Sequence, residues 1–249
     1  MKKILGIDVG GTKIAAGLVD NKLRVSSIAI MPTSQTDLVR QLVNLVGSYD
    51  GFSAIGLAIP GQVLGNGVVT RLPNVKDFDS VNLKQMMAKK FKVPVNVLND
   101  AKAFTFAEAL VGQGKDSTVV AGIILGTGVG VGIVIDKKIY LGKDGIAGEL
   151  EHVTLLDNKM FRDHRHAAGE FVNAHEAKKY LKTILNMVVL SFNPDVIVLG
   201  GSWSKLTGME VLANTLTTSV GGYKNTTPVR ISKLKHAGII GVALPLLKK

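Results

Sequence analysis

The sequence predicts an α/β protein of two similar lobes, each a mixed sheet flanked by helices. Short apolar strands alternate with helical segments along the 249 residues. Twice, an apolar strand enters a glycine–threonine turn and returns as a second strand, at residues 3–19 and 118–135. A polar, glycine-rich stretch at Gly112–Asp116 lies between these halves, and we expect the lobe boundary there.

The first half alternates buried strands with helices whose apolar residues recur at helical spacing. In the segment Thr36–Ser48, Leu38, Leu42 and Leu45 share one helical face, and Ser34 or Thr36 is the expected N-cap. The other expected helices are Leu83–Phe91 and Ala101–Val111. Expected strands are Lys3–Val9, Thr12–Val19, Val25–Met31, Ser53–Ile59 and Val93–Leu98.

The second half repeats the opening of the first. Strands are expected at Thr118–Leu125, Val131–Ile135, Val196–Leu199 and Val229–Ser232, with a glycine turn at Gly126–Gly130. Helices are expected at Lys178–Phe192 and Ala237–Leu247. No literal sequence repeat is visible, so the duplication is a structural expectation.

Composition excludes several classes of protein. The chain has no cysteine, which removes disulfides and thiolate metal sites and fits a cytoplasmic location. No leader and no membrane-spanning run is visible, so we expect no membrane partner. The net charge of +11 suits a general solvated surface or a polyanion. Because lysines are scattered and aromatic residues make up 5%, we expect no nucleic-acid partner.

The first glycine turn has the residues of an anion site. Gly10 and Gly11 let backbone N–H groups approach a phosphate closely, while Thr12 adds a hydroxyl donor and Lys13 a charge. Asp8 precedes them at a strand end and suits a hydrated Mg²⁺. The order Thr12-Lys13 reverses that of a P-loop, and the turn leads into a strand, so we reject a P-loop.

The second glycine turn holds Gly126, Thr127 and Gly128 in the matching position. Its glycines fall on every second residue, which differs from the dinucleotide-binding fingerprint. Either turn alone is compatible with an ordinary hairpin. The pair in corresponding positions favours phosphate binding.

These segments resemble the motifs of the ROK family of sugar kinases and repressors, within the sugar kinase/actin/Hsp70 superfamily. The two turns look like its phosphate motifs, and Gly200-Gly201 looks like its adenosine motif. Further matching segments, in family order, are Ile59-Pro60-Gly61, Leu98–Ala101, Ala147–His152 and Ala237–Ala243. The resemblance implies a two-lobed actin-like ATPase fold (ribonuclease H-like) with a cleft between lobes. The lobes would be residues 1–115 plus 237–249, and residues 116–236.

By resemblance, Asp100 is the catalytic base that accepts the proton of a sugar hydroxyl. Asn99 beside it would hydrogen-bond the sugar, and Gly61 would also line the sugar site. The alternative is that Asp100 is an ordinary helix N-cap. The reaction implied is in-line transfer of the terminal phosphoryl group of ATP, with Mg²⁺, to a hexose hydroxyl, that of C6 in glucose.

Glu149 and His152 match the family's Glu-x-Gly-His sugar motif. Glu151 departs from it, since the family has glycine there, and its charge is expected to alter recognition of sugar hydroxyls. Glu170 is expected to stand in for the last sugar-binding glutamate of the family. The alternative is a surface acidic run with no ligand.

The family's cysteine-rich zinc segment is absent. His152, His164 and His166 are the zinc candidates in its place, but histidines this close are often solvated, and we do not expect a structural zinc.

Four functions compete. The favoured one is an ATP-dependent glucokinase-like hexose kinase, with a sugar and a phosphate donor as partners and a homodimer implied by the resemblance. A polyphosphate-dependent glucokinase is the alternative enzyme, because such relatives are short and lack the cysteine segment. A non-catalytic sugar-binding ROK protein is the third. A repressor is disfavoured, because a helix-turn-helix has no room before the first motif at residue 8.

Overall fold

Two compact units make up the computed structural model, which describes residues 2–72, 80–126, 128–167, 169, 171, 173–216, 219–220, 223–224 and 226–247. The first unit comprises Met1–Ala107, Leu141–Ile146 and Lys235–Lys249, and the second comprises Glu108–Tyr140 and Ala147–Leu234. Each contains a five-stranded mixed sheet with helices, which confirms the expected α/β class. The assignment of functional lobes to residue ranges stays a prediction.

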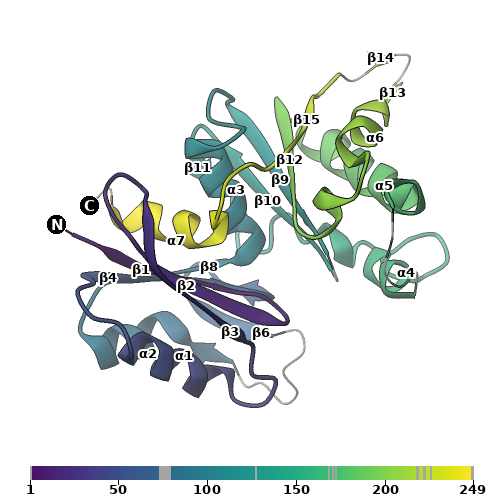
Figure 1. Ribbon diagram of the computed structural model, residues 1–249. Helices are drawn as coiled ribbons and strands as arrows, with labels where there is room; N and C mark the ends of the chain where they lie inside the picture. The colour runs from purple at the N-terminus through teal and green to yellow at the C-terminus, as the bar shows by residue number, and fades with distance from the viewer. Residues whose placement is uncertain are drawn as a thin grey trace. The chain divides into compact units, whose positions relative to one another are not determined.

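The sheet of the first unit has antiparallel and parallel parts. Its strands, in spatial order, are β3 (Val25–Pro32), β2 (Lys13–Val19), β1 (Ile4–Val9), β4 (Ala54–Ile59) and β8 (Val95–Asn99). Strand β2 runs antiparallel to both β1 and β3, whereas β1, β4 and β8 run parallel. Helices α1 (Leu38–Gly47) and α2 (Leu83–Phe91) cover one face, and α7 (Ala237–Leu247) covers the other (Figure 1).

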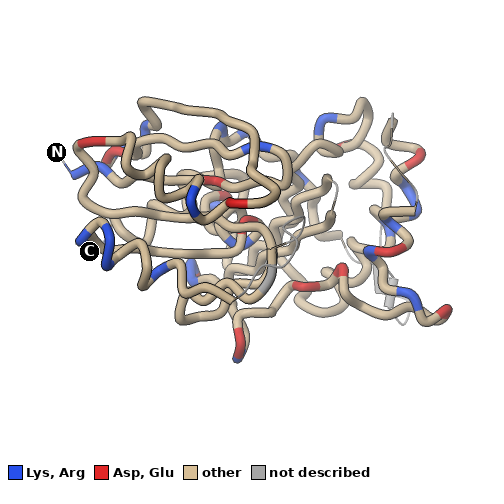
Figure 2. The backbone as a smooth tube through the Cα atoms, turned by 90° about the horizontal axis from the view of Figure 1, so that it is seen from below, with Lys and Arg blue, Asp and Glu red and all other residues tan. Residues whose placement is uncertain are grey.

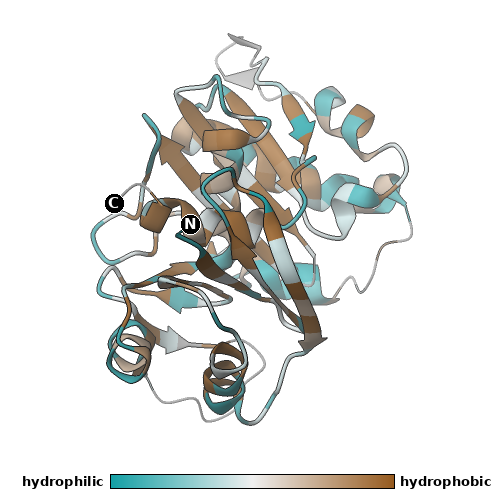
Figure 3. Cartoon of the chain, turned by 60° about the vertical axis from the view of Figure 1, so that its left-hand side comes forward, coloured by the Kyte–Doolittle hydropathy of each residue, from teal (hydrophilic) through white to brown (hydrophobic). Residues whose placement is uncertain are grey.

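Successive side chains along β1 point to opposite faces of the sheet, so alternate residues pack in different cores. Leu5, Ile7 and Val9 join the core beneath α1 and α2, while Ile4 packs against α7. Gly6 also faces α7, and a Cβ built on it would lie 2.6 Å from the carbonyl oxygen of Ile239. Only glycine therefore allows the helix backbone to approach the strand this closely. Figure 3 shows the strands of both large sheets as mostly apolar.

The N-cap of α1 differs from expectation. Asp37, and neither Ser34 nor Thr36, caps the helix, with its carboxylate accepting from the backbone N–H of Arg40 at 3.2 Å. Ser34 instead uses its hydroxyl to accept from the N–H of Asp37. The prediction was wrong by one residue because all three side chains can cap, and the entry of the chain into the helix selects among them.

Smaller elements complete the first unit. A three-stranded sheet consists of β5 (Gln62–Val63), β6 (Val68–Arg71) and β7 (Val81–Asn82). Helix α3 (Asp100–Val111) follows β8 directly, and its residues from Glu108 onward belong to the second unit. The two-residue strands lacked a periodic signal long enough to be predicted.

The sheet of the second unit has the same strand order and directions as that of the first. Its strands are β11 (Lys138–Ile139), β10 (Val129–Ile135), β9 (Val119–Leu125), β12 (Val196–Gly200) and β15 (Val229–Ile231). Strand β10 is antiparallel to β9 and β11, and β9, β12 and β15 are parallel. The duplicated topology expected from the two hairpins is therefore present.

Helix α5 (Ala174–Phe192) supplies much of the second core. Leu181, Ile184 and Leu185 are buried with Ile123 and Leu199 of the sheet. The remaining elements are α4 (Phe161–Ala167), α6 (Met209–Thr215), the 3₁₀ helices η1 (Leu150–His152) and η2 (Trp203–Lys205), and the hairpin of β13 (Ser219–Val220) and β14 (Tyr223–Lys224).

The second glycine turn is shorter than expected. Strand β10 begins at Val129 rather than at Val131, and Val129 pairs with Leu125. Gly130, which was expected in the turn, lies within the strand, because a glycine-rich sequence conceals where a strand begins.

Charged residues occur along much of the chain. Figure 2 shows Lys and Arg positions distributed along the elements of both units. Across the described part of the chain, every helix is too short or too polar to cross a bilayer.

Candidate functional site

The carboxyl ends of the parallel strands in the first unit gather several predicted site residues. Asp8 lies near the end of β1, Gly61 follows β4, and Asp100 follows β8. The register pairs Asp8 with Ala58 of β4, and Ile59 of β4 with Asn99. Because neighbouring strands lie about 4.8 Å apart, β1 and β8, whose ends carry Asp8 and Asp100, lie roughly 10 Å apart across the sheet. Ligands of open α/β sheets bind at such edges.

Asp8 is the last residue of the row on β1 that faces α7. A Cβ built on Gly238, in the first turn of α7, would lie 2.4 Å from Oδ2 of Asp8. Burial raises the pKa of the Asp8 carboxyl from 3.8 to about 6, and the charge of Lys13 opposes part of this increase. At neutral pH the ionised Asp8 carboxylate would therefore be stabilised by a positively charged group beside it.

The carbonyl oxygens of the first glycine turn accept hydrogen bonds from the segment that follows β3. The Thr33 hydroxyl donates to the carbonyl of Gly10 at 2.8 Å, and the Thr33 N–H donates to that of Thr12 at 3.0 Å. The Gln35 amide donates to the carbonyl of Gly11 at 3.1 Å. Within the described residues, the N–H groups of Gly11 and Thr12 donate to no acceptor. The turn thus presents exposed donors, as an anion site requires.

Asn99 is the N-cap of α3, so the capping role belongs to Asn99 and not to Asp100. Its Oδ1 accepts from the N–H of Lys102 at 3.2 Å, and its Nδ2 donates to the carbonyl of Gly61 at 3.0 Å. Gly61 has φ +95°, a conformation that favours glycine. Asp100, half-buried, is the first residue of the helix, and its Oδ1 accepts from the adjacent N–H of Ala101. The capping alternative considered for Asp100 therefore applies to Asn99.

The second unit repeats this arrangement with glycines. Gly126 and Gly128 flank the tip of the β9–β10 hairpin, and Gly200-Gly201 ends the neighbouring strand β12. Gly201 has φ +85°, and a Cβ there would lie 2.2 Å from the carbonyl oxygen of Leu125. The predicted donor-binding glycines of the second unit therefore share one edge of its sheet. Thr127 lies outside the described residues.

The Glu149–His152 segment runs beside the second turn. Gly148 has φ +88°, and a Cβ on it would lie 2.3 Å from the carbonyl oxygen of Val131, so the chain crosses β10 closely. Oε2 of Glu151 then accepts from the N–H of Val129 at 2.8 Å. His152 Nε2 lies 3.7 Å from Glu151 Oε1 and 3.9 Å from Glu149 Oε2.

The zinc candidates are not gathered together. His164 Nε2 lies 2.9 Å from Oδ2 of Asp157, and this hydrogen-bonded histidine lowers the pKa of the Asp157 carboxyl. Across the described ranges, no group of three or more His, Asp or Glu side chains has the geometry to hold a metal. Glu170 lies outside the described residues.

Arg165, which the sequence analysis missed, contacts the second turn from α4. Its guanidinium is buried, donates to the carbonyl of Gly126 at 2.8 Å and to that of Gly169 at 2.6 Å, and lies 4.4 Å from the Trp203 ring centroid and 4.9 Å from that of Phe171. No local spacing signals this contact, because its partners come from distant segments. Thr33 and Gln35 escaped notice for the same reason.

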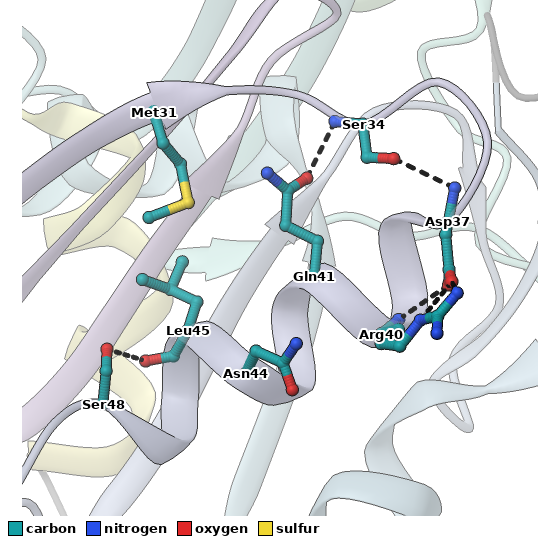
Figure 4. Close-up of a pocket in the computed structure, with 8 residues that line it drawn as sticks. All are labelled: Met31, Ser34, Asp37, Arg40, Gln41, Asn44, Leu45 and Ser48. Atoms are coloured by element: carbon teal, nitrogen blue, oxygen red, sulfur yellow. Dashed lines mark hydrogen bonds and ion pairs between the residues drawn. The ribbon is translucent and has the colours of Figure 1, made fainter.

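An open depression on the first unit contains none of the predicted site residues (Figure 4). It lies between α1 and the end of β3, and its polar groups largely bind one another. The Gln41 amide oxygen accepts from the N–H of Ser34, and Arg40 pairs with Asp37. These contacts belong to the start of α1.

Comparison with known proteins gives consistent matches. The chain is 34% identical over 164 residues to a glucokinase of Thermotoga maritima, and 36% identical over 157 residues to an N-acetyl-D-glucosamine kinase of Aliivibrio salmonicida. These alignments cover 63% and 60% of this chain. They cover 52% of each relative, so the chain spans about half the length of the curated relatives it matches.

Solved structures share the fold over nearly the whole chain. A ROK family glucokinase from Streptomyces griseus, in complex with glucose and AMPPNP, superposes with a TM-score of 0.81 at 24% identity, covering 98% of both chains. An inorganic polyphosphate/ATP-glucomannokinase from Arthrobacter sp. strain KM gives 0.74 at 26% identity, covering 100% of both. The ROK family model matches residues 4–165, and the chain belongs to the ROK family.

Proposed function

We propose that the protein is a sugar kinase that transfers the terminal phosphoryl group of ATP to a hexose hydroxyl, the 6-hydroxyl of glucose. The observation that carries this proposal is the shared carboxyl edge of β1, β4 and β8. It presents two half-buried carboxylates, Asp8 and Asp100, beside a glycine turn with free N–H donors. Phosphoryl transfer needs mainly alignment and charge neutralisation, which these groups can supply.

Asp100 is assigned the role of general base. Because Asn99 caps α3, the Asp100 carboxylate is not needed to cap the helix. It can accept the proton of the attacking hydroxyl, while Asn99 and Gly61 keep the start of the helix in place. Glu149 and His152 are assigned to sugar binding in the second unit.

Asp8 suits Mg²⁺ by the chemistry of its donor atoms. One carboxylate, with the retained waters and donor phosphates, is the usual ligand set for this ion. The bound ion would neutralise charge on the donor phosphates. Gly10, Gly11, Thr12 and Lys13 are assigned to these phosphates, as are Gly126, Thr127 and Gly128 in the second unit. Gly200 and Gly201 are assigned to the adenosine.

The donor has a second candidate, inorganic polyphosphate. The net charge of +11 suits a polyanion, and the Arthrobacter enzyme, described as using polyphosphate or ATP, matches along its full length. The sugar also has alternatives, since one relative carries the name of a glucokinase and another that of an N-acetylglucosamine kinase. We place the activity in the cytoplasm and expect a homodimer.

A coupled assay tests the proposal directly. The purified protein is offered glucose, mannose, N-acetylglucosamine and N-acetylmannosamine, each with MgATP and with Mg²⁺-polyphosphate, and the sugar phosphate is quantified. Phosphorylation of glucose with ATP is the expected result. If glucose is phosphorylated with polyphosphate but not with ATP, the donor is polyphosphate instead of ATP. If calorimetry detects sugar binding but no sugar phosphate forms with either donor, the result favours the non-catalytic alternative.

A further inference from the structure

The carboxylate of Glu151 is bound to the second glycine turn. Its Oε2 lies 2.8 Å from the backbone nitrogen of Val129, and a Cβ built on Gly128 would lie 3.1 Å from the same oxygen. The side chain of Glu151 remains 20% exposed. The sequence analysis placed this residue on the sugar side, but its hydrogen bond goes to the turn assigned to phosphate.

A carboxylate in this position has the charge and acceptor geometry of a phosphate oxygen. Glycine turns bind anions through their backbone N–H groups, and the Val129 N–H belongs to the first residue of β10 after the turn. A charged acceptor binds such a donor about twice as strongly as a neutral one. An incoming phosphate therefore meets an occupied N–H and a like charge.

The turn has a second support that does not depend on Glu151. Arg165 donates to the carbonyl of Gly126, at the opposite end of the turn from Val129, and its guanidinium lies over the rings of Trp203 and Phe171. The N–H of Gly126 also donates to the carbonyl of Gly128 at 3.0 Å. The turn can therefore keep its shape when Glu151 moves away.

We propose that Glu151 occupies the anion site of the second glycine turn and that a donor phosphate must displace it to bind. This rests on the proposed function, since it assumes that the turn receives phosphate. Glu151 thereby weakens donor binding and selects for donors with enough negative charge and enough other contacts to replace it.

The test measures binding, so it does not require turnover. Dissociation constants for inorganic tripolyphosphate and for Mg²⁺-AMPPNP are determined by calorimetry for the wild type, Glu151→Gln and Glu151→Ala. The glutamine can still accept from the Val129 N–H but carries no charge, whereas alanine removes both. Glu210→Gln, on the exposed face of α6, is the matched control for a lost surface charge. Thermal unfolding verifies that each variant folds.

Both Glu151 variants should bind tripolyphosphate roughly tenfold more tightly than the wild type, the effect of removing one charge-assisted competitor. Glu210→Gln should bind as the wild type does. If glutamine binds like the wild type and alanine binds more weakly, Glu151 only braces the turn and the proposal is wrong. Unchanged binding in both variants overturns it equally. If neither probe binds any of the proteins, the donor assignment itself fails, and this inference with it.

Discussion

The carboxylate of Asp8 lies against the backbone of Gly238, so closely that a methyl group on Gly238 would come within 2.4 Å of it. Strand β1, which leads into the first glycine turn, therefore packs tightly against the first turn of α7. The contact joins residues far apart in sequence and fixes where the Asp8 carboxylate lies.

Gly238→Ala should disturb this contact. Although alanine favours a helix over glycine, the added methyl group must push Asp8 aside, and overpacking of this kind costs about 1–3 kcal/mol. We expect a lower melting temperature and a higher KM for the donor. Gly47→Ala, at the end of α1 with open space around it, is the control and should be neutral or slightly stabilising. Equal behaviour of the two variants would contradict the fit described here.

Asp8→Asn should stabilise the protein at neutral pH. The folded state raises the pKa of this carboxyl from 3.8 to about 6, so it binds the proton more tightly than the unfolded state does. Wild-type stability should therefore fall as pH rises from about 4 to 6, and the deficit should persist above that range. Allowing for partial exposure, we expect the variant to be about 2 kcal/mol more stable above pH 6.

Denaturant unfolding of both proteins across this pH range measures the effect. The two curves should converge below about pH 4, where both states of the wild type hold the proton. A constant difference at every pH would show that Asp8 acts through packing alone. Donor binding should be weakened in the variant despite its greater stability.

Asp100→Asn and Asn99→Ala should separate catalysis from capping. Asp100→Asn keeps the shape of the side chain and should lower kcat by at least about a hundredfold, the usual contribution of a general base, with the sugar dissociation constant nearly unchanged. Asn99→Ala should instead cost about 1 kcal/mol of stability, as the loss of a helix N-cap does. Asp50→Asn, exposed and outside the site, is the control for both measurements. Full activity of the Asp100 variant would remove the assigned base.

Arg165→Lys should destabilise the second unit even though the charge is kept. A lysine has no planar guanidinium to lie over the rings of Trp203 and Phe171 and to donate to two carbonyl oxygens at once, so we expect a loss of about 2–3 kcal/mol. The partly exposed Arg162→Lys on the same helix should change stability by less than about 0.5 kcal/mol. Chemical denaturation followed by Trp203 fluorescence reports directly on this cluster. Similar losses in both variants would mean that the stacking adds little.

The sequence predicted what periodicity and turn chemistry determine. Helices α2 and α7 begin and end where expected, and both glycine hairpins are present. It missed what only tertiary contact determines. The choice of Asp37 over Ser34 as cap, the contact of Arg165 with Gly126 and the direction of the Glu151 carboxylate each depend on segments that meet only in the folded chain.

The glycine-lined contact between α7 and β1 also bears on the order in which the chain is completed during synthesis. Ile239 and Ala243 pack against Ile4, Val19 and Ala54, which are translated before them. The face of the first sheet that packs against α7 therefore stays exposed to solvent until residues 237–247 have been synthesised. All strands of the second sheet have been synthesised by then. Strands β1, β2 and β4 are therefore made before the helix that covers this face, and until α7 packs there their apolar side chains stay exposed to solvent.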